Sequence, residues 1–168
     1  MAMLWIIEIA NLLTLHSLSS LGIVPRTLWG LIGIPLAPFL HNSVIHLFFN
    51  TIPLAILGGL VIFSGKKLFI TNTLFIILAG GAGLWVIGRP GAHVGASGLI
   101  FGYFGYLAAR GFFKRDVLSI IIACLTVFAY KGLLWGIAPT FGRVSWEGHL
   151  CGLAAGIFLA WMEKKKSD

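Results

Sequence analysis

Residues 95–105 read Gly-Ala-Ser-Gly-Leu-Ile-Phe-Gly-Tyr-Phe-Gly, which joins a candidate nucleophile to a helix-packing pattern. Ser97 lies between small residues and begins an apolar segment that extends to about Phe113. A helix N-terminus offers free N–H groups and the positive end of the helix dipole, both of which suit a developing negative charge. On this stretch alone, however, a serine that merely caps the helix is the commoner explanation.

The composition of the chain is that of a membrane protein. Of its 168 residues 58% are hydrophobic and 10% are charged, and the mean hydropathy is +0.98, whereas soluble domains contain about 25% charged residues. The net charge of +7 does not indicate nucleic-acid binding, because the basic residues lie between apolar runs and near the C-terminus. The first apolar stretch lacks a basic n-region and carries Glu8 and Asn11, so we expect a retained span rather than a cleaved signal.

Six apolar segments approach the length of about 20 residues that crosses a bilayer. We expect one all-α, polytopic membrane domain over residues 1–168, with six transmembrane helices. The approximate spans are 1–17, 41–63, 67–87, 97–113, 117–137 and 147–162. Residues 18–40 contain three prolines and three glycines, which favour a half-immersed interfacial first loop, with Trp29 at headgroup level, over a straight helix.

Basic residues are unequally divided between the two ends of these predicted helices. Eight of the twelve lie at one end: Lys66, Lys67, Arg110, Lys114, Arg115, Lys164, Lys165 and Lys166. The other end carries Arg26, Arg89, Lys131 and Arg143. Because an excess of Lys and Arg marks the cytoplasmic side, we expect both termini in the cytoplasm.

Three polar residues from distant parts of the chain share one predicted depth. Spans two, four and six run inward from the outer face, and His46, Ser97 and His149 lie early in them. Polar residues inside a membrane are costly and face the bundle interior or water. One such histidine is usually structural, but a serine and two histidines at one level favour a functional site.

Small-residue stripes predict close packing of the fourth and sixth spans. The stripes are Gly98, Gly102 and Gly105 on one span, and Gly148, Gly152 and Gly156 on the other. Such spacing lets membrane helices approach backbone to backbone. Close approach would bring the Ser97 hydroxyl within about 2.6–3.2 Å of the His149 imidazole, the distance of a nucleophile from its general base.

The predicted pair has no acidic third member. Glu147 is two residues from His149 and points to nearly the opposite helix face, so we expect a Ser–His dyad. His46 and Asn50 share a face of the second span and can donate hydrogen bonds to an oxyanion together with the Ser97 N–H. An interhelical polar clamp is the alternative role for His46 and Asn50.

Five motifs resemble, in order, the signatures of the rhomboid intramembrane serine proteases in their compact six-span prokaryotic form. They are Gly22-Ile23-Val24-Pro25-Arg26, Ala37-Pro38-Phe39-Leu40-His41, His46-Leu47-Phe48-Phe49-Asn50, Gly95-Ala96-Ser97-Gly98 and Gly148-His149-Leu150-Cys151-Gly152. The resemblance implies a rhomboid-like bundle with its first loop in the outer leaflet. It also implies a multi-pass protein of the bacterial or archaeal cytoplasmic membrane that cuts single-span membrane proteins near the outer ends of their helices.

The same resemblance assigns roles to individual residues. It implies Ser97 as nucleophile, His149 as general base, and His46 and Asn50 in the oxyanion hole, with Gly95 allowing close approach. Phe101 stands where the family often has a tyrosine packed on the histidine, and it keeps the ring contact without the hydroxyl. His41 either supports the site or has no role, and His93 is expected to be a solvated loop residue.

Three other functions are alternatives to a serine endopeptidase that uses no cofactor or metal. A non-catalytic rhomboid-like protein would bind membrane clients, but such relatives lack the serine or the histidine. A metal or haem protein would use His41, His46 and His149, but the chain contains no H-E-x-x-H motif. A small channel or transporter fits the composition, with no motif in its favour.

Overall fold

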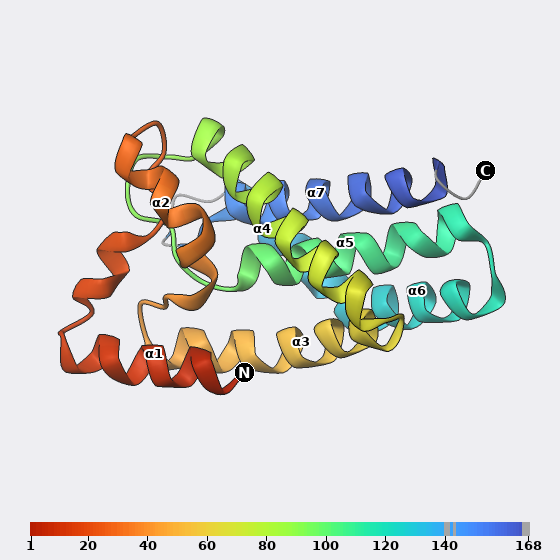
Figure 1. Ribbon diagram of the computed structural model, residues 1–168, viewed down its shortest axis with the longest axis horizontal. Coiled ribbons are helices and arrows are strands. Elements are labelled where there is room, and N and C mark those ends of the chain that lie inside the picture. Colours follow the sequence, from red (N-terminus) through yellow and green to blue (C-terminus); the bar gives the residue numbers. More distant parts are fainter. Residues whose placement is uncertain (140–141, 143, 166–168) are drawn as a thin grey trace.

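A computed structural model describes residues 1–139, 142 and 144–165, and all of its regular elements are helices (Figure 1). The α-helices are α1 (Ala2–Leu13), α2 (Leu28–Leu36), α3 (Val44–Phe63), α4 (Lys66–Ile87), α5 (Ser97–Lys114), α6 (Val117–Tyr130) and α7 (Trp146–Lys165). Three 3₁₀ segments, η1 (Ser17–Leu21), η2 (Ala37–Phe39) and η3 (Lys131–Ile137), lie between them. The all-α class predicted from the sequence is therefore confirmed.

Three of the described helices are long and apolar enough to cross a membrane. They are Val44–Phe63, Lys66–Ile87 and Val117–Ile137, the last formed by α6 and η3 together. Helix α1 contains 12 residues and ends at Leu13, four residues before the end of the predicted first span. The predicted first loop contains the nine-residue helix α2, which begins where the Thr27 hydroxyl accepts a hydrogen bond from the Gly30 N–H.

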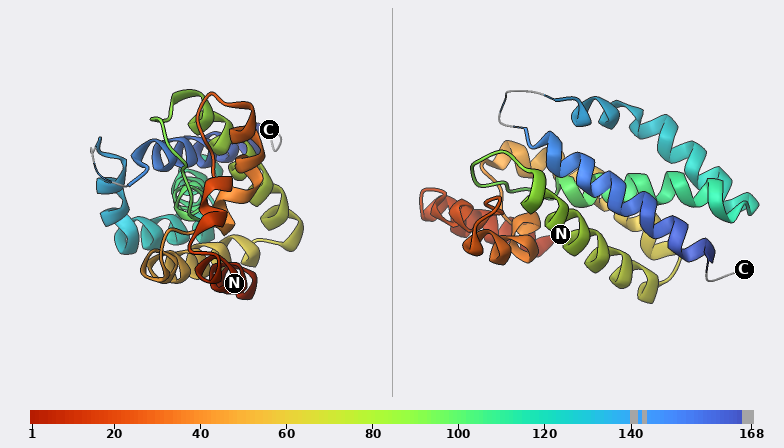
Figure 2. Two further views of the ribbon diagram at one scale, coloured as in Figure 1. Left: turned by 90° about the vertical axis from the view of Figure 1, so that its left-hand side faces the viewer. Right: turned by 90° about the horizontal axis from the view of Figure 1, so that it is seen from above.

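Helix α5 forms the centre of the bundle. It packs against α7, α6, α3 and α4, and Figure 2 shows it end-on with the other helices around it. Ten of its eighteen residues are buried, among them Tyr103 and Tyr106. Because most of its surface contacts protein rather than lipid, α5 can carry glycines, tyrosines and Arg110 within a membrane bundle.

Helices α5 and α7 lie side by side, run in the same direction and touch through their glycines (Figure 1). A Cβ added to Gly152 would collide with the Gly98 carbonyl, and one added to Gly156 would collide with the Gly102 carbonyl. The side of α7 that contacts α5 therefore has no room for a methyl group at Gly152 or Gly156. This close approach matches the packing that the two glycine stripes predicted.

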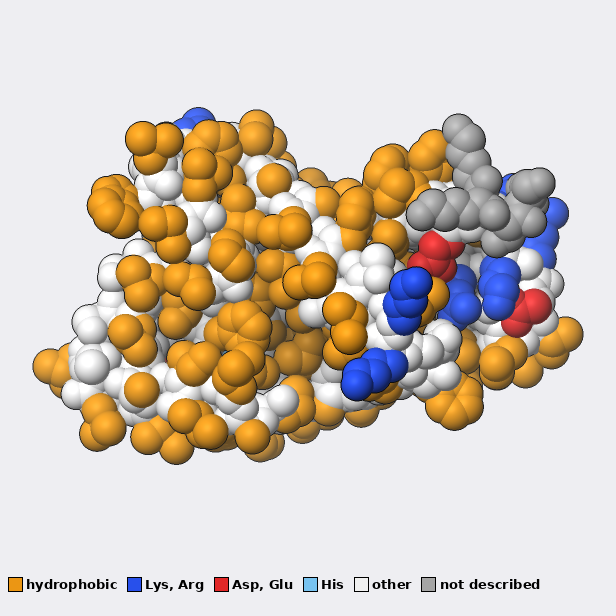
Figure 3. Space-filling view, viewed as in Figure 1, with side chains coloured by type: hydrophobic (Ala, Val, Ile, Leu, Met, Phe, Trp, Pro, Cys, Tyr) orange, Lys and Arg blue, Asp and Glu red, His pale blue; other side chains and the backbone are white. Residues whose placement is uncertain are grey.

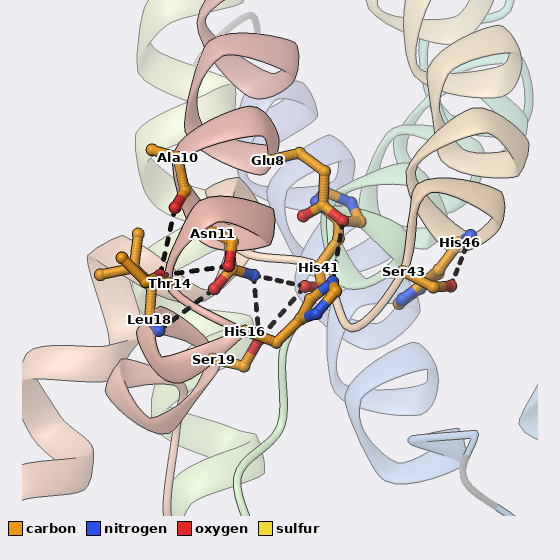
Figure 4. A network of polar contacts seen from close by, with 10 residues as sticks. All are labelled: Glu8, Ala10, Asn11, Thr14, His16, Leu18, Ser19, His41, Ser43 and His46. Atoms are coloured by element: carbon orange, nitrogen blue, oxygen red, sulfur yellow. Dashed lines mark hydrogen bonds and ion pairs between the residues drawn. The ribbon is translucent and has the colours of Figure 1, made fainter.

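The polar residues of α1 point inward. Glu8 is 1% exposed and Asn11 is fully buried. The Asn11 amide donates to the Ser19 hydroxyl and to the His41 carbonyl, and its oxygen accepts from the Leu18 N–H (Figure 4). Asn11 thereby connects α1 to both ends of the first loop.

Charged side chains gather at the end of the molecule where α5 and α7 finish, and apolar side chains dominate the surface away from it (Figure 3). At this end Asp116 caps α6, accepting hydrogen bonds from the Ser119 hydroxyl at 2.7 Å and the Ser119 N–H at 3.0 Å. These bonds hold the pKa of the Asp116 carboxyl well below its usual range. Two of the basic residues counted above, Arg143 and Lys166, lie outside the described residues.

Candidate active site

The structure brings Ser97 and His149 into direct contact. Ser97 is the first residue of α5, and His149 lies in the first turn of α7. The Ser97 Oγ and His149 Nε2 atoms are 2.9 Å apart. Ser97 does not act as the helix cap, because Ala96 occupies the N-cap position and no side chain caps α5. The interpretation of Ser97 as a helix cap is therefore wrong, and its hydroxyl is hydrogen-bonded to the His149 imidazole instead.

The second nitrogen of His149 is held by a backbone group. Nδ1 lies 2.8 Å from the carbonyl oxygen of Gly136, in η3. Because a carbonyl can only accept, Nδ1 carries the proton and Nε2 is left with a lone pair that faces Ser97. The Phe101 ring stacks on the imidazole with centroids 4.2 Å apart and planes 7° apart. Gly136 and Phe101 together fix the rotation of the His149 ring.

Gly95 brings the backbone ahead of Ser97 against His46 and Asn50. Its φ is +119°, and an added Cβ would lie 2.7 Å from His46 Cε1 and 3.5 Å from Asn50 Nδ2. The Asn50 amide nitrogen is buried and makes no hydrogen bond to any other residue that the structure describes. Two side-chain donors thus converge beside the N-terminus of α5, where the first N–H groups lack partners within the helix.

His41 supports the backbone just ahead of Ser97. It is fully buried, and its Nε2 accepts a hydrogen bond from the Ala96 N–H at 3.4 Å. Its ring packs edge-on against the His46 ring, with centroids 5.1 Å apart. Its carbonyl accepts from Asn11 and from the Ser19 hydroxyl, as Figure 4 shows. His41 therefore contacts both the residue before the serine and the predicted oxyanion donor.

A cleft of about 700 Å³ opens over these side chains. Its wall includes His46, Asn50, Ser97 and His149, together with Phe49 from α3 and Leu133 from η3. The mixture of polar and apolar lining suits an extended peptide segment whose side chains are largely apolar. Among the described residues, no group of three His, Cys, Asp or Glu side chains has the arrangement of a metal site.

Sequence reasoning missed the contacts that His93 and Arg89 make with the start of α7. His93 Nδ1 lies 2.7 Å from the Ser145 hydroxyl, so the expectation of a solvated loop residue is wrong. Arg89 Nε lies 2.6 Å from a carboxylate oxygen of Glu147. Glu147 was predicted to face away from His149, and it is buried in this ion pair. An isolated pair of opposite charges 58 positions apart leaves no recognisable pattern in one sequence.

We expect Gly95→Ala to make the Ser97 hydroxyl much less reactive while leaving the protein folded. The fold holds residue 95 at a positive φ, which alanine disfavours. The added methyl also displaces the His46 ring from the N-terminus of α5. The rate at which a fluorophosphonate probe labels Ser97 should fall by about 10²-fold, as when one oxyanion donor is lost. Gly91→Ala is a matched control, since Gly91 also has a positive φ but open space around it. Equal losses in the two variants would refute the specific role of Gly95.

Comparison with known proteins identifies the family. A family model described as Rhomboid domain matches residues 25–166. An uncharacterized protein of Mycobacterium leprae is 42% identical over 174 residues, covering 96% of this chain and 68% of the relative. The rhomboid protease GlpG of Klebsiella pneumoniae is 32% identical over 136 residues, covering 74% of this chain and 46% of that protein.

GlpG of Salmonella choleraesuis is 28% identical over 183 residues, covering 95% of this chain and 62% of that protein. The chain thus spans about half to two thirds of the length of these two proteases. The family model covers most of the chain, including every residue of the cleft described above. With its apolar helices and its matched domain, this chain is a membrane protein that belongs to the rhomboid family.

Proposed function

We propose that this protein is an intramembrane serine endopeptidase that cleaves transmembrane segments of single-span membrane proteins. The observation that carries the proposal is the 2.9 Å contact between Ser97 Oγ and His149 Nε2. It occurs in a chain of the rhomboid family, two of whose relatives bear the name of rhomboid protease. The Ser–His dyad needs no metal or cofactor.

We place the protein in a bacterial or archaeal cytoplasmic membrane with six spans and both termini in the cytoplasm. The charged end of the bundle, where α5 and α7 finish, would then face the cytoplasm. The first loop, with η1, α2 and η2, would lie half-immersed in the outer leaflet. Trp29 on α2 and Trp135 on η3 are 80% and 82% exposed, which suits side chains at the outer interface.

The proposed reaction begins with the Ser97 hydroxyl. Oγ forms a bond to the scissile carbonyl carbon while its proton passes to His149 Nε2. The C–N bond then breaks as the imidazolium returns that proton to the leaving amine, which leaves an acyl group on Ser97. Water from the outer face attacks this ester with His149 again as base, and the acid product departs. The Gly136 carbonyl accepts a hydrogen bond from His149 Nδ1–H throughout, and it stabilises the imidazolium that forms twice in each cycle.

Charge on the carbonyl oxygen would be stabilised by His46, Asn50 and the Ser97 N–H. The buried Asn50 amide nitrogen lines the cleft and has no hydrogen-bond partner among the described residues. A preorganised donor of this kind stabilises the transition state by several kcal/mol, about 3 kcal/mol in comparable sites. The substrate segment would enter the cleft from the membrane near its outer end and present its bond between Ser97 and these donors.

A fluorophosphonate probe tests this function directly. We expect the purified protein in detergent to become labelled on Ser97, as shown by peptide mass spectrometry, and to lose cleavage of a transmembrane substrate in parallel. Heat-denatured protein is the control, because an isolated serine does not react. Folded wild-type protein that is not labelled, yet retains membrane clients in a pull-down, would favour a non-catalytic client-binding protein instead.

A further inference from the structure

A buried ion pair joins the loop ahead of Ser97 to the helix turn that carries His149. The Glu147 side chain is 2% exposed, and its Oε1 lies 2.6 Å from Arg89 Nε and 3.3 Å from the Arg89 backbone nitrogen. The Arg89 guanidinium also donates to the Val144 carbonyl at 2.7 Å. Arg89 lies in the loop between α4 and α5, whereas Glu147 lies in the first turn of α7 and Val144 lies just before that helix. The dyad itself does not use this pair.

A second set of hydrogen bonds joins the same two segments. The Ser145 hydroxyl accepts from the Gly148 N–H at 3.3 Å and lies 2.7 Å from His93 Nδ1. His93 Nε2 lies 2.9 Å from the Arg89 carbonyl. Because that carbonyl can only accept, Nε2 carries the proton and Nδ1 accepts from Ser145. His93 therefore links Arg89 to the residue that caps the first turn of α7.

The position of His149 at a helix end explains why such contacts matter. Helix termini fray, and the first four N–H groups of α7 have no partner within the helix. The tightest glycine contacts between α5 and α7, at Gly152 and Gly156, lie further along α7 than His149. The Arg89–Glu147 pair acts at the first turn of α7, two residues before His149 and eight before Ser97.

We propose that Arg89 and Glu147 are positioning residues that set the distance between Ser97 and His149. The inference rests on the proposed serine-protease function and adds two residues to it. A misplacement of about 1 Å in a catalytic pair can lower a rate by about 10²-fold. The pair therefore acts on the reaction through geometry, without touching the substrate.

The decisive variant is Glu147→Gln, which keeps the side-chain size and removes the charge. Arg89 is one-third exposed and its guanidinium keeps its hydrogen bond to the Val144 carbonyl, so the variant is expected to fold. We expect the rate constant for fluorophosphonate labelling of Ser97 to fall by about 10- to 100-fold, with the final labelled fraction unchanged. The concentration of probe at half-maximal rate should also stay the same, because probe binding does not involve the pair.

Glu163→Gln is the matched control, since it makes the same chemical change at the other end of α7, where Glu163 accepts from Tyr106. Its labelling rate should equal that of the wild type. Arg89→Lys tests the pair from its other side and should show the same slow labelling, because lysine cannot reproduce the fork that reaches both Glu147 and Val144.

The outcomes separate this inference from the proposed function. Wild-type protein that is never labelled would overturn both. Labelled wild type with an equal rate in Glu147→Gln and Arg89→Lys would overturn the positioning role alone. A lower labelled fraction with an unchanged rate would do the same, since it would show that the pair only stabilises the fold.

Discussion

Replacing either Ser97 or His149 by alanine is expected to lower substrate cleavage by at least about 10³-fold. Without Ser97 there is no atom to form the acyl-enzyme, and without His149 the hydroxyl keeps its proton. Ser97 Oγ and His149 Nε2 are hydrogen-bonded to each other at 2.9 Å, so the two residues act as a unit. The double variant should therefore be no slower than either single variant. Cleavage of a single-span substrate in proteoliposomes, followed by gel electrophoresis, measures the rates.

Ser20→Ala is the control for this experiment. Ser20 is an exposed serine whose hydroxyl bonds only the Ser17 carbonyl among the described contacts, so its loss should leave cleavage unchanged. Thermal unfolding in detergent should show that all of these variants remain folded. Residual cleavage by Ser97→Ala within about tenfold of the wild-type rate would assign the reaction to another nucleophile.

The parts of the site that the sequence revealed are those that leave a periodic or local pattern. Glycines at helical spacing predicted the contact of α5 with α7, and the meeting of Ser97 with His149 was expected from their places early in two apolar segments. Glu8 and Asn11, three residues apart in an apolar run and therefore on one helix face, are both buried. These properties depend on residue type and spacing, which one sequence displays directly.

The parts that it did not reveal depend on backbone atoms or on single long-range pairs. The group that orients His149 is the Gly136 carbonyl, which every residue type possesses, so no side chain marks it. The pattern of acidic residues in the sequence therefore carries no information about this carbonyl. Arg89, His93 and Glu147 meet only because two segments converge. The predicted end of the first span lies four residues beyond the end of α1, because residues 14–17 contain no proline or glycine to mark that end, yet they form a turn and the start of η1.

Gly152→Ala should disable the protein through its fold rather than its chemistry. The added methyl collides with the Gly98 carbonyl, and a backbone carbonyl cannot rotate away as a side chain would. Helices α5 and α7 must then separate, at a cost of about 3 kcal/mol in the free energy of unfolding. Since these helices carry Ser97 and His149, their separation also breaks the dyad, and labelling of the fraction that stays folded should slow by about 10²-fold.

Gly59→Ala provides the comparison that makes this result specific. Gly59 lies in α3, and no atom lies within 4 Å of the position its Cβ would take. Alanine is a better helix former than glycine, so the melting temperature in detergent should be unchanged or higher, with wild-type labelling. If Gly152→Ala instead melted and reacted like Gly59→Ala, the two helices could not be packed backbone to backbone, and the contact that joins Ser97 to His149 would need another support.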